Sequence, residues 1–393
     1  MKKIIIFITL ITSLLSLFAQ EDRYAPVLSQ IEQNSTTLKA LREQADAQKL
    51  SYRTGLAPSD PEVEFGYLWG NPMATGNRKD ISVKQTFDFP TTYIRRKQMA
   101  DQQGESAELS YRQQRLELLL SAKQVCINLV YYNALLELYG KQAERAAQIE
   151  SACAKMLENG SGSQLDYNKA VFNRVSAEGE VAKIRLERER LMAELQQLNG
   201  GQPIAFDFSA YGTPSLPADF ETWYATAKES HPALQYLHSQ EAVANCNIRL
   251  NRSAWMPKWS VGYMGEFIPE QGFQGVTVGL TLPLWENKNR VRQAQAEAVA
   301  TAQQRNDLEL RYRSQWQQLY AQAAQLRETV ERYAAVFSQH NNADLLYKAY
   351  ISGEMPLLNY LLETEYYLSA YEKQLQAQRD LELTLSELNG FRL

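Results

Sequence analysis

The sequence predicts a mainly α-helical protein with a membrane-type β portion, in which two similar halves each contain a helix, a β-hairpin, a long helix, a turn and a further helix. Three observations lead to this fold class. Residues 287–352 contain neither proline nor glycine, which indicates very long helices. Four short segments alternate apolar and polar residues, as half-buried strands do. Motifs of the first half recur in the second half about 195 residues later, which indicates a duplicated unit.

The N-terminal segment has the pattern of a secretory signal. Lys2 and Lys3 form a basic start, residues 4–18 form an apolar stretch, and Ala19 marks a plausible cleavage point. We therefore predict a signal peptide over residues 1–20 and export of the remaining chain. No apolar run of the ~18 residues that a spanning helix requires follows it, and no cysteine lies beside the cleavage point to carry a lipid anchor.

The charge balance gives no support to a nucleic-acid partner. The chain has 41 basic and 45 acidic residues and a formal net charge of −4, whereas nucleic-acid binding requires a basic patch or stripe. The three cysteines, Cys126, Cys153 and Cys246, are few and odd in number. We expect them to be small apolar residues rather than a disulfide framework.

Two very long helices are predicted, one over residues 91–158 and one over residues 287–352. The first of these segments contains no proline and only two glycines, Gly104 and Gly140. A helix of roughly 65 residues is ~90–100 Å long, far beyond an ordinary globular helix. Apolar residues at heptad spacing favour coiled-coil packing; they include Leu361, Leu368 and Leu375.

The second half of the chain is a divergent copy of the first. Pro61, Gly66 and Tyr67 match residues 196 positions later, and GSGSQLDY at 160–167 matches GEMPLLNY at 353–360. The offset decreases along the chain, as small insertions and deletions in loops would produce. We predict a first repeat over residues 21–200, an irregular connector over 201–220 and a second repeat over 221–393. The tip turns are predicted at 159–163 in the first repeat and at 353–356 in the second.

Four segments have the two-residue period of strands: 61–70, 80–89, 257–267 and 275–285. Each has about the ten residues that a tilted transmembrane strand needs. We predict that the apolar side faces lipid and that Glu62 and Glu64 face water. The predicted lipid-facing residues are Val63, Phe65, Tyr67, Trp69, Trp259, Val261, Tyr263 and Phe267. The alternative is two hairpins of a soluble α+β domain, with their apolar sides packed on helices.

Four strands cannot close a barrel, and a membrane does not tolerate open sheet edges in lipid. If the strands span a membrane, several chains must share one barrel, and three chains would supply 12 strands around a lumen. With three chains, the helices that continue the strands would extend the same tube away from the membrane, as a trimeric α-helical barrel joined to a shared 12-stranded transmembrane β-barrel. Basic residues directly after both hairpins, at 95–97 and 288–292, suit either the lipid headgroups or a solvated helix start.

Polar side chains after both tip turns are candidates for a pore constriction. Asp166 and Asn359 occupy equivalent positions, and Glu363 and Glu365 follow about one helical turn later. Rings of carboxylates in a narrow pore attract cations. The alternative for Asp166 is an ordinary first-turn acid that interacts favourably with the helix dipole.

The turn residues are explained first by backbone geometry. We expect Gly160, Gly162 and Gly353 to adopt the positive φ that a helix reversal requires. We expect Pro356 to occupy the first turn of the returning helix.

The sequence shows no pattern for catalysis, and we expect neither an enzyme nor a cofactor. His231 and His238 lie seven residues apart, but no cysteine or carboxylate pattern accompanies them to complete a zinc site. No phosphate-binding loop, nucleophile elbow or catalytic-triad spacing occurs. An exported enzyme is therefore the least supported alternative.

Together with the signal segment, the duplication and the LNG motifs at 198–200 and 388–390, the turn motifs resemble those of a known family. NGSGSQLDYNKA (159–170) and SGEMPLLNYLLE (352–363) resemble the Gly-x-x-(Ser/Pro)-x-x-(Asp/Asn) tip motif of the TolC-type outer-membrane efflux proteins. The segments FPTTYIRRKQMADQQ and LWENKNRVRQAQAEA resemble the family's arginine-containing helix starts. Among its branches, the chain is most similar to the CzcC-like heavy-metal branch.

The resemblance implies a homotrimeric exit duct in the outer membrane that extends into the periplasm and works with an adaptor protein and an inner-membrane pump. It implies passive conduction without catalysis. It also implies that the adaptor docks at the tip turns, which contain Gly160, Gly162, Ser163, Gly353 and Pro356. The chain differs from some members in carrying Asn359 and Leu362 where paired aspartates form acidic rings. The alternative function is a soluble periplasmic coiled-coil scaffold or adaptor.

Overall fold

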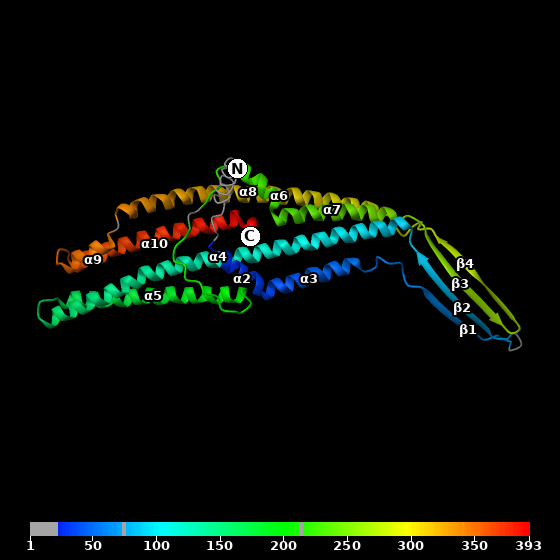
Figure 1. Ribbon diagram of the computed structural model, residues 1–393, viewed down its shortest axis with the longest axis horizontal. Helices are drawn as coiled ribbons and strands as arrows, with labels where there is room; N and C mark the ends of the chain where they lie inside the picture. The colour runs from blue at the N-terminus through cyan, green and yellow to red at the C-terminus, as the bar shows by residue number, and fades with distance from the viewer. Residues whose placement is uncertain (1–22, 73–75, 213–214, 341) are drawn as a thin grey trace, which may run out of the picture. The chain divides into compact units, whose positions relative to one another are not determined.

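The computed structural model describes residues 23–72, 76–212, 215–340 and 342–393; the predicted signal peptide over residues 1–20 lies outside them. Figure 1 shows long helices and one small sheet. The elements in chain order are α2 (Ala25–Asn34), α3 (Thr36–Arg53), β1 (Glu62–Leu68), β2 (Arg78–Phe87), α4 (Pro90–Glu158), α5 (Gln164–Leu198), α6 (Phe220–Ser230), α7 (Pro232–Ser253), β3 (Lys258–Ile268), β4 (Gln271–Thr281), α8 (Arg290–Gln339), α9 (Ala343–Ile351), α10 (Leu357–Leu388) and the short 3₁₀ helix η2 (Gly390–Arg392). Within the described residues, no helix has both the length and the hydropathy needed to cross a membrane.

The chain folds as two compact units. The first contains Met1–Lys39, as far as it is described, with Arg115–Trp223 and Gln315–Leu393, and the second contains Ala40–Gln114 and Tyr224–Ser314. Both tip turns and the connector belong to the first unit, and the sheet belongs to the second.

In the first unit, the helices pack in the order α8, α10, α4, α5. Ala323 of α8 packs on Leu381 of α10. Leu375 of α10 lies in one buried cluster with Leu135 of α4 and Ile184 of α5, and Figure 1 shows α4 between α5 and α10. Long helices that bury a narrow apolar seam on each neighbour are typical of coiled-coil packing.

The connector between the repeats contains no helix or strand in its described residues from 201 to 219, yet it is anchored to the core. Phe206 is buried and stacks on Tyr24 with ring centroids 6.5 Å apart. The Tyr211 hydroxyl donates a hydrogen bond to the Ile127 carbonyl oxygen of α4 at 3.0 Å, and burial raises the pKa of Tyr211. Side chains rather than backbone ladders therefore fix this irregular segment beside α4.

The single helix that the sequence predicts over residues 287–352 is two helices. α8 starts at Arg290, directly after Asn289, whose φ of 67° is outside the helical region. It ends at Gln339, and α9 starts at Ala343 with Asn342 as its N-cap. Serine, histidine and asparagine have low helix propensity, and asparagine favours caps. The polar sequence around residue 340 therefore ends α8 without proline or glycine.

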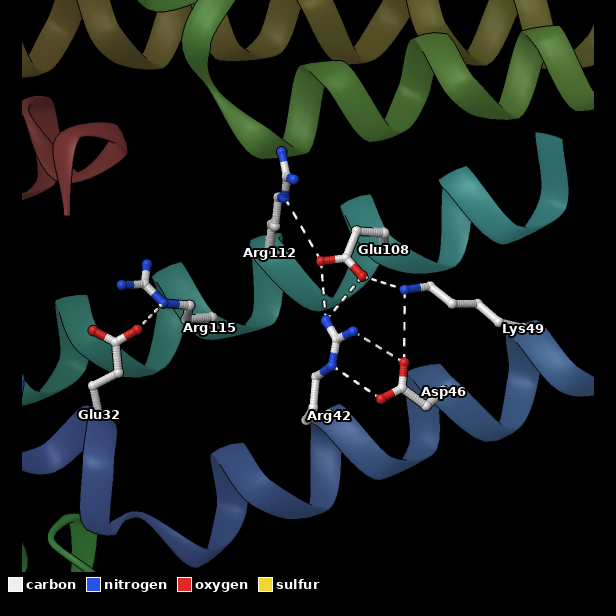
Figure 2. A network of polar contacts seen from close by, with 7 residues as sticks. All are labelled: Glu32, Arg42, Asp46, Lys49, Glu108, Arg112 and Arg115. Carbon is white, nitrogen blue, oxygen red and sulfur yellow. Dashed lines mark hydrogen bonds and ion pairs between the residues drawn. The ribbon is translucent and has the colours of Figure 1, made fainter. Parts of the chain in front are cut away.

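An ion pair between helices occurs at equivalent positions of the two repeats with its charges exchanged. Glu32 of α2 pairs with Arg115 of α4 at 2.7 Å (Figure 2), and Lys228 of α6 pairs with Glu309 of α8 at 3.1 Å. Lys228 follows Glu32 by 196 residues, and Glu309 follows Arg115 by 194. The duplication inferred from the sequence thus extends to this contact.

In the second unit, a group of charged side chains joins α3 to α4 (Figure 2). The Glu108 carboxylate accepts hydrogen bonds from Lys49 and from Arg42, the latter at 2.9 Å, and Arg42 also pairs with Asp46 at 3.0 Å. The hydrogen bond from Lys49, with the charges of Lys49 and Arg42, holds the pKa of Glu108 below its usual range. Because the folded pKa is lowered, this carboxylate stabilises the fold at neutral pH, and the contribution is lost as the pH falls through the lowered value.

The N-terminus of α7 depends on the neutral form of a histidine. His231 is the N-cap residue, and its Nδ1 accepts a hydrogen bond from the backbone N–H of Ala233 at 3.2 Å. Burial lowers the pKa of His231 to about 4. Since the unfolded chain takes up this proton near pH ~6.5, the stability from His231 is complete above that pH and decreases toward about pH 4.

Replacing His231 with asparagine should remove this pH dependence, because asparagine is a good N-cap residue that does not titrate. Between about pH 7.5 and pH 5, we expect the natural chain to lose roughly 2 kcal/mol more unfolding free energy than His231→Asn. Denaturant titrations of both proteins in detergent at the two pH values measure the difference. An equal decrease in both proteins would contradict the role assigned to His231.

Candidate functional site

The four strands form one antiparallel sheet in the order β1-β2-β3-β4. β2 pairs directly with β3, although α4, α5, α6 and α7 lie between them in the chain. The register places Val63 opposite Val83, Val83 opposite Tyr263, and Tyr263 opposite Val276. Because side chains alternate between the faces of a sheet, these four residues form one row on one face.

One face of the sheet is mainly apolar from edge to edge and is exposed, although the register also places Lys79, Gln85 and Gln274 on it. Val63, Val276 and Val278 are 72%, 75% and 78% exposed. Soluble monomers rarely expose apolar surface of this extent. The packing of this face on helices, the alternative that the sequence leaves open, does not occur within the described residues. The register assigns to this face Val63, Phe65, Tyr67, Ile81, Val83, Phe87, Trp259, Val261, Tyr263, Phe267, Val276, Val278 and Leu280.

The other face carries mainly charged, hydroxyl and glycine residues, although Leu68, Met264, Ile268 and Phe273 also lie on it. Arg78 pairs there with Asp80 at 2.8 Å and with Glu266 at 3.1 Å. A Cβ at Gly262 would lie 2.6 Å from the Val83 carbonyl oxygen, so only glycine allows this close approach of β3 to β2. The polar residues of this face are Glu62, Glu64, Arg78, Asp80, Ser82, Lys84, Thr86, Lys258, Ser260, Glu266, Gln271, Thr277 and Thr281.

The fourth strand starts earlier than the predicted segment 275–285, because β4 runs from Gln271 to Thr281. Ile268 pairs with Gln271, which leaves Pro269 and Glu270 as the whole connection, with Glu270 at a φ of 66°. A two-residue turn begins the returning strand at once. The apolar alternation continues to residue 284, so it does not reveal where the pairing ends.

Both outer strands have an open edge: in the described sheet, β1 pairs only with β2 and β4 pairs only with β3. Trp69, one of the predicted lipid-facing residues, lies just beyond the end of β1 and is 80% exposed. An exposed edge next to an apolar face is a template for strand pairing with another chain.

The two tip turns have the same hydrogen-bond geometry. In each, the glycine N–H bonds to the carbonyl oxygen three residues earlier, and the next N–H bonds to the carbonyl oxygen five residues earlier. The φ angle is 70° at Gly160 and 81° at Gly353, as in a Schellman helix ending. The turns match at the offset of 193 residues found in the sequence.

Two turn residues differ from their predicted roles. Gly162 does not adopt a positive φ; a Cβ there would lie 2.8 Å from the Met156 Cβ, so its small size lets the chain pass the end of α4. Pro356 is the N-cap residue of α10 and not a residue of its first turn. The equivalent N-cap of α5 is Ser163, whose hydroxyl accepts a hydrogen bond from the Leu165 N–H at 3.1 Å.

Alanine should destabilise the second turn at Gly353 but stabilise α4 at Gly140. An added Cβ would meet no atom within 4 Å at either position, and only Gly353 has a positive φ. We expect Gly353→Ala to cost ~1–2 kcal/mol because of the left-handed backbone. We expect Gly140→Ala to add ~0.5–1 kcal/mol through helix propensity. Thermal unfolding measures both changes, and two changes of the same sign would contradict this account.

The four candidate aperture residues lie near the helix starts but not on one surface. Asp166 is in the first turn of α5 and pairs with Lys169 at 3.3 Å. Asn359 and Glu363 are exposed and lie four residues apart, so they share one side of α10. Glu365 is also exposed, but at about 100° per residue it is on a different side from Glu363. The structure therefore does not bring Glu363 and Glu365 together within one chain.

A tyrosine cluster behind the turns is absent from the sequence-based predictions. Tyr360 is 1% exposed and stacks on Tyr350 with ring centroids 5.2 Å apart. The Tyr350 hydroxyl lies 3.6 Å from the Cys153 Sγ, and burial raises the pKa of Tyr350. Neutral phenols thus hold α4, α9 and α10 together next to the tip. The high tyrosine count of 22 is a signal in the sequence, but a count does not show where the tyrosines gather.

The described residues contain no group of histidine, cysteine, aspartate and glutamate side chains that could hold a metal ion. The distinctive features of the arrangement are an exposed apolar sheet face, two open strand edges and two matched helix reversals.

Solved structures similar to this chain include bacterial outer-membrane channels. CusC, described as a transmembrane channel, aligns with a TM-score of 0.76 at 16% identity over 95% of this chain and 92% of its own. The CmeC outer membrane channel of Campylobacter jejuni aligns with a TM-score of 0.76 at 16% identity over 94% and 85%. The open MtrE outer membrane channel of Neisseria gonorrhoeae aligns with a TM-score of 0.74 at 16% identity over 94% and 88%. No protein-family model and no curated protein sequence matches this chain.

Proposed function

We propose that this chain, which has the fold of the TolC-type outer-membrane efflux channels, is the outer-membrane exit duct of a tripartite efflux or secretion system. It forms a homotrimer located in the outer membrane and extends into the periplasm. A periplasmic adaptor protein and an inner-membrane pump deliver the substrates, and the duct conducts them passively. The pump supplies the energy, so the chain itself catalyses no reaction.

The observation that carries this proposal is the four-stranded sheet with an exposed apolar face and two open edges. In lipid, the apolar face is favourable, but the unpaired backbone groups of the edges are not. Pairing β4 of one copy with β1 of the next removes every edge. Three copies then make a 12-stranded barrel with the apolar face outside and the polar face, including Glu62 and Glu64, around the lumen.

An exposed apolar stripe on α5 supports the same closure for the helices. Leu165, Phe172 and Leu186 are 62%, 75% and 67% exposed and lie in one heptad register. The buried residues of α5, such as Val181 and Ile184, face the opposite way at about 100° per residue. Because α5 and α8 are the two ends of the helix order, we propose that α5 of one copy packs on α8 of the next.

The tip is the proposed site of adaptor docking and of the aperture. The two Schellman turns project short exposed loops that contain Gly160, Ser163, Gly353 and Pro356. Asp166, Asn359, Glu363 and Glu365 lie within the first three turns of the returning helices. In a trimer, each position occurs three times, so even one carboxylate per chain produces a ring that attracts cations.

Membrane fractionation tests the proposal against the soluble scaffold or adaptor. We expect the mature protein to stay in the membrane fraction after salt and carbonate washes, to need detergent for release, and to migrate as a trimer. The purified protein should form ion-conducting channels in planar bilayers. Release by carbonate without detergent, or a stable monomer that does not conduct, would support the scaffold and contradict the duct.

Ion selectivity tests the aperture residues. We expect Asp166→Asn, and Glu363→Gln combined with Glu365→Gln, to decrease the cation preference of the channel, because each removes negative charge near the constriction. Reversal potentials in a salt gradient across a planar bilayer measure the preference. Because Glu363 and Glu365 lie on different sides of α10, the single variants will show which one faces the pore. Unchanged reversal potentials in all variants would remove these residues from the pore lining.

A further inference from the structure

The loop between β4 and α8 has an inverted polarity. Leu282, Leu284 and Trp285 are 56%, 59% and 81% exposed, whereas the polar Asn287 is only 4% exposed. The Asn287 side-chain amide donates a hydrogen bond to the Ala254 carbonyl oxygen at the end of α7. The loop is therefore held in place by its polar residue, while its largest apolar side chains point away from the protein. In water, the opposite arrangement would be favoured.

Neighbouring segments enlarge this apolar surface. Trp255 and Met256, which follow the anchoring Ala254, are 45% and 43% exposed, and Ile94 in the second turn of α4 is 55% exposed. At the same end of the sheet, Phe87 contacts Trp259 with ring centroids 5.2 Å apart. The surface thus continues the apolar face of the sheet beyond the ends of its strands.

Basic residues border this surface. Segment 88–97 contains three basic residues and one acidic residue, and segment 282–292 has the same composition. The acidic residue of the first segment, Asp88, is already paired with Arg96 at 2.8 Å and with Lys258 at 3.7 Å. Lys97, Lys288 and Arg292 are exposed, so their charges are available to an outside partner.

We propose that this surface, called here the collar (Ile94, Lys97, Trp255, Met256, Leu282, Leu284, Trp285, Lys288 and Arg292), lies in the headgroup layer of one membrane leaflet and binds anionic phospholipid. The inference rests on the proposed membrane location of the sheet and adds a lipid class to it. Tryptophan and snorkelling lysine or arginine side chains favour the interface between acyl chains and water. Basic residues at that level attract anionic headgroups. The collar is continuous with the lipid-facing surface of the strands. Lipid already covers that surface, so no protein partner is needed to cover the collar.

Lipid retention by the purified full-length protein tests the collar. The detergent-solubilised protein is equilibrated with equal amounts of phosphatidylglycerol and phosphatidylcholine, and the bound lipids are counted by native mass spectrometry. We expect the natural chain to retain phosphatidylglycerol about tenfold over phosphatidylcholine, and the triple variant Lys97→Gln, Lys288→Gln, Arg292→Gln to lose most of this preference. A control triple variant with exposed basic residues changed elsewhere, Lys183→Gln, Arg185→Gln and Arg332→Gln, should keep it.

A second variant separates the apolar part from the charged part. Trp285→Ala should decrease the retention of both lipids without changing their ratio, because it removes contact area but no charge. Equal retention of the two lipids by the natural chain, or an unchanged ratio in the triple collar variant, would overturn the proposal. Planar-bilayer conductance of the same preparations decides the proposed function separately. A collar variant that conducts normally but has lost its lipid preference supports both proposals, whereas a natural chain that does not conduct overturns the duct.

Discussion

Arginine at Val83 is expected to remove the protein from the outer membrane, whereas arginine at the adjacent Ser82 is expected to leave it there. The register places Val83 on the apolar face between Val63 and Tyr263, and places Ser82 on the polar face opposite Glu64. On the lipid face of a barrel, an arginine near the membrane midplane costs ~2–4 kcal/mol, and a trimer would carry three. On the polar face, the same side chain meets water and an opposite charge.

The amount of detergent-extracted trimer in the membrane fraction measures this difference. We expect Val83→Arg to decrease it at least tenfold and Ser82→Arg to stay within about twofold of the natural chain. Both variants introduce the same arginine side chain, but on opposite faces of β2. Effects of the added charge and volume on expression should therefore be the same in both. Equal loss in both would mean that the sheet does not have one lipid face, and retention of both would place the sheet outside the membrane.

Aspartate at Phe172 is expected to prevent trimer formation without unfolding the chain. Phe172 is 75% exposed in the single chain, so the fold gains little from it. In the proposed assembly, its ring is buried between α5 and α8 of adjacent copies. An uncompensated carboxylate there costs several kcal/mol, roughly 3–5 for a buried unpaired charge, at each of three equivalent contacts.

Cross-linking in membranes and native mass spectrometry in detergent measure the oligomeric state of this variant, and circular dichroism measures its helix content. We expect natural helix content with monomers in place of trimers. Arg185→Asp is the control, because Arg185 is exposed on a different side of α5 and its replacement should leave the trimer intact. A trimeric Phe172→Asp protein would show that the heptad stripe is not an interface between copies.

The strands show how far a two-residue period can be used. Strict alternation assigned Val63, Phe65 and Tyr67 to one face, and the register agrees. It did not locate the bounds of β4. The pairing begins directly after the Pro269–Glu270 turn and ends at Thr281, whereas the alternation continues to residue 284. Local patterns determine which residues share a face, whereas hydrogen bonds to a partner strand determine where the strand begins and ends.

The helices show a similar division. The absence of proline and the scarcity of glycine predicted the length of α4 correctly, from Pro90 to Glu158, but the absence of both residues from 287–352 predicted one helix where α8 and α9 are separate. The break occurs in a run of residues that each disfavour helix only weakly. Their combined effect on helix stability is smaller than that of one proline. Whether the helix ends at these residues therefore depends on whether tertiary packing stabilises it there.

The sequence by itself determined the duplication, the four strand segments with their two faces, the long helices and the matched glycine turns. These features depend on local backbone preference and on residue period, which are present in the order of amino acids. Only the tertiary structure decided that β2 pairs with β3 and that α4 lies between α5 and α10. Those arrangements depend on which apolar surfaces meet, and the same surface could have been buried by several partners at similar free energy.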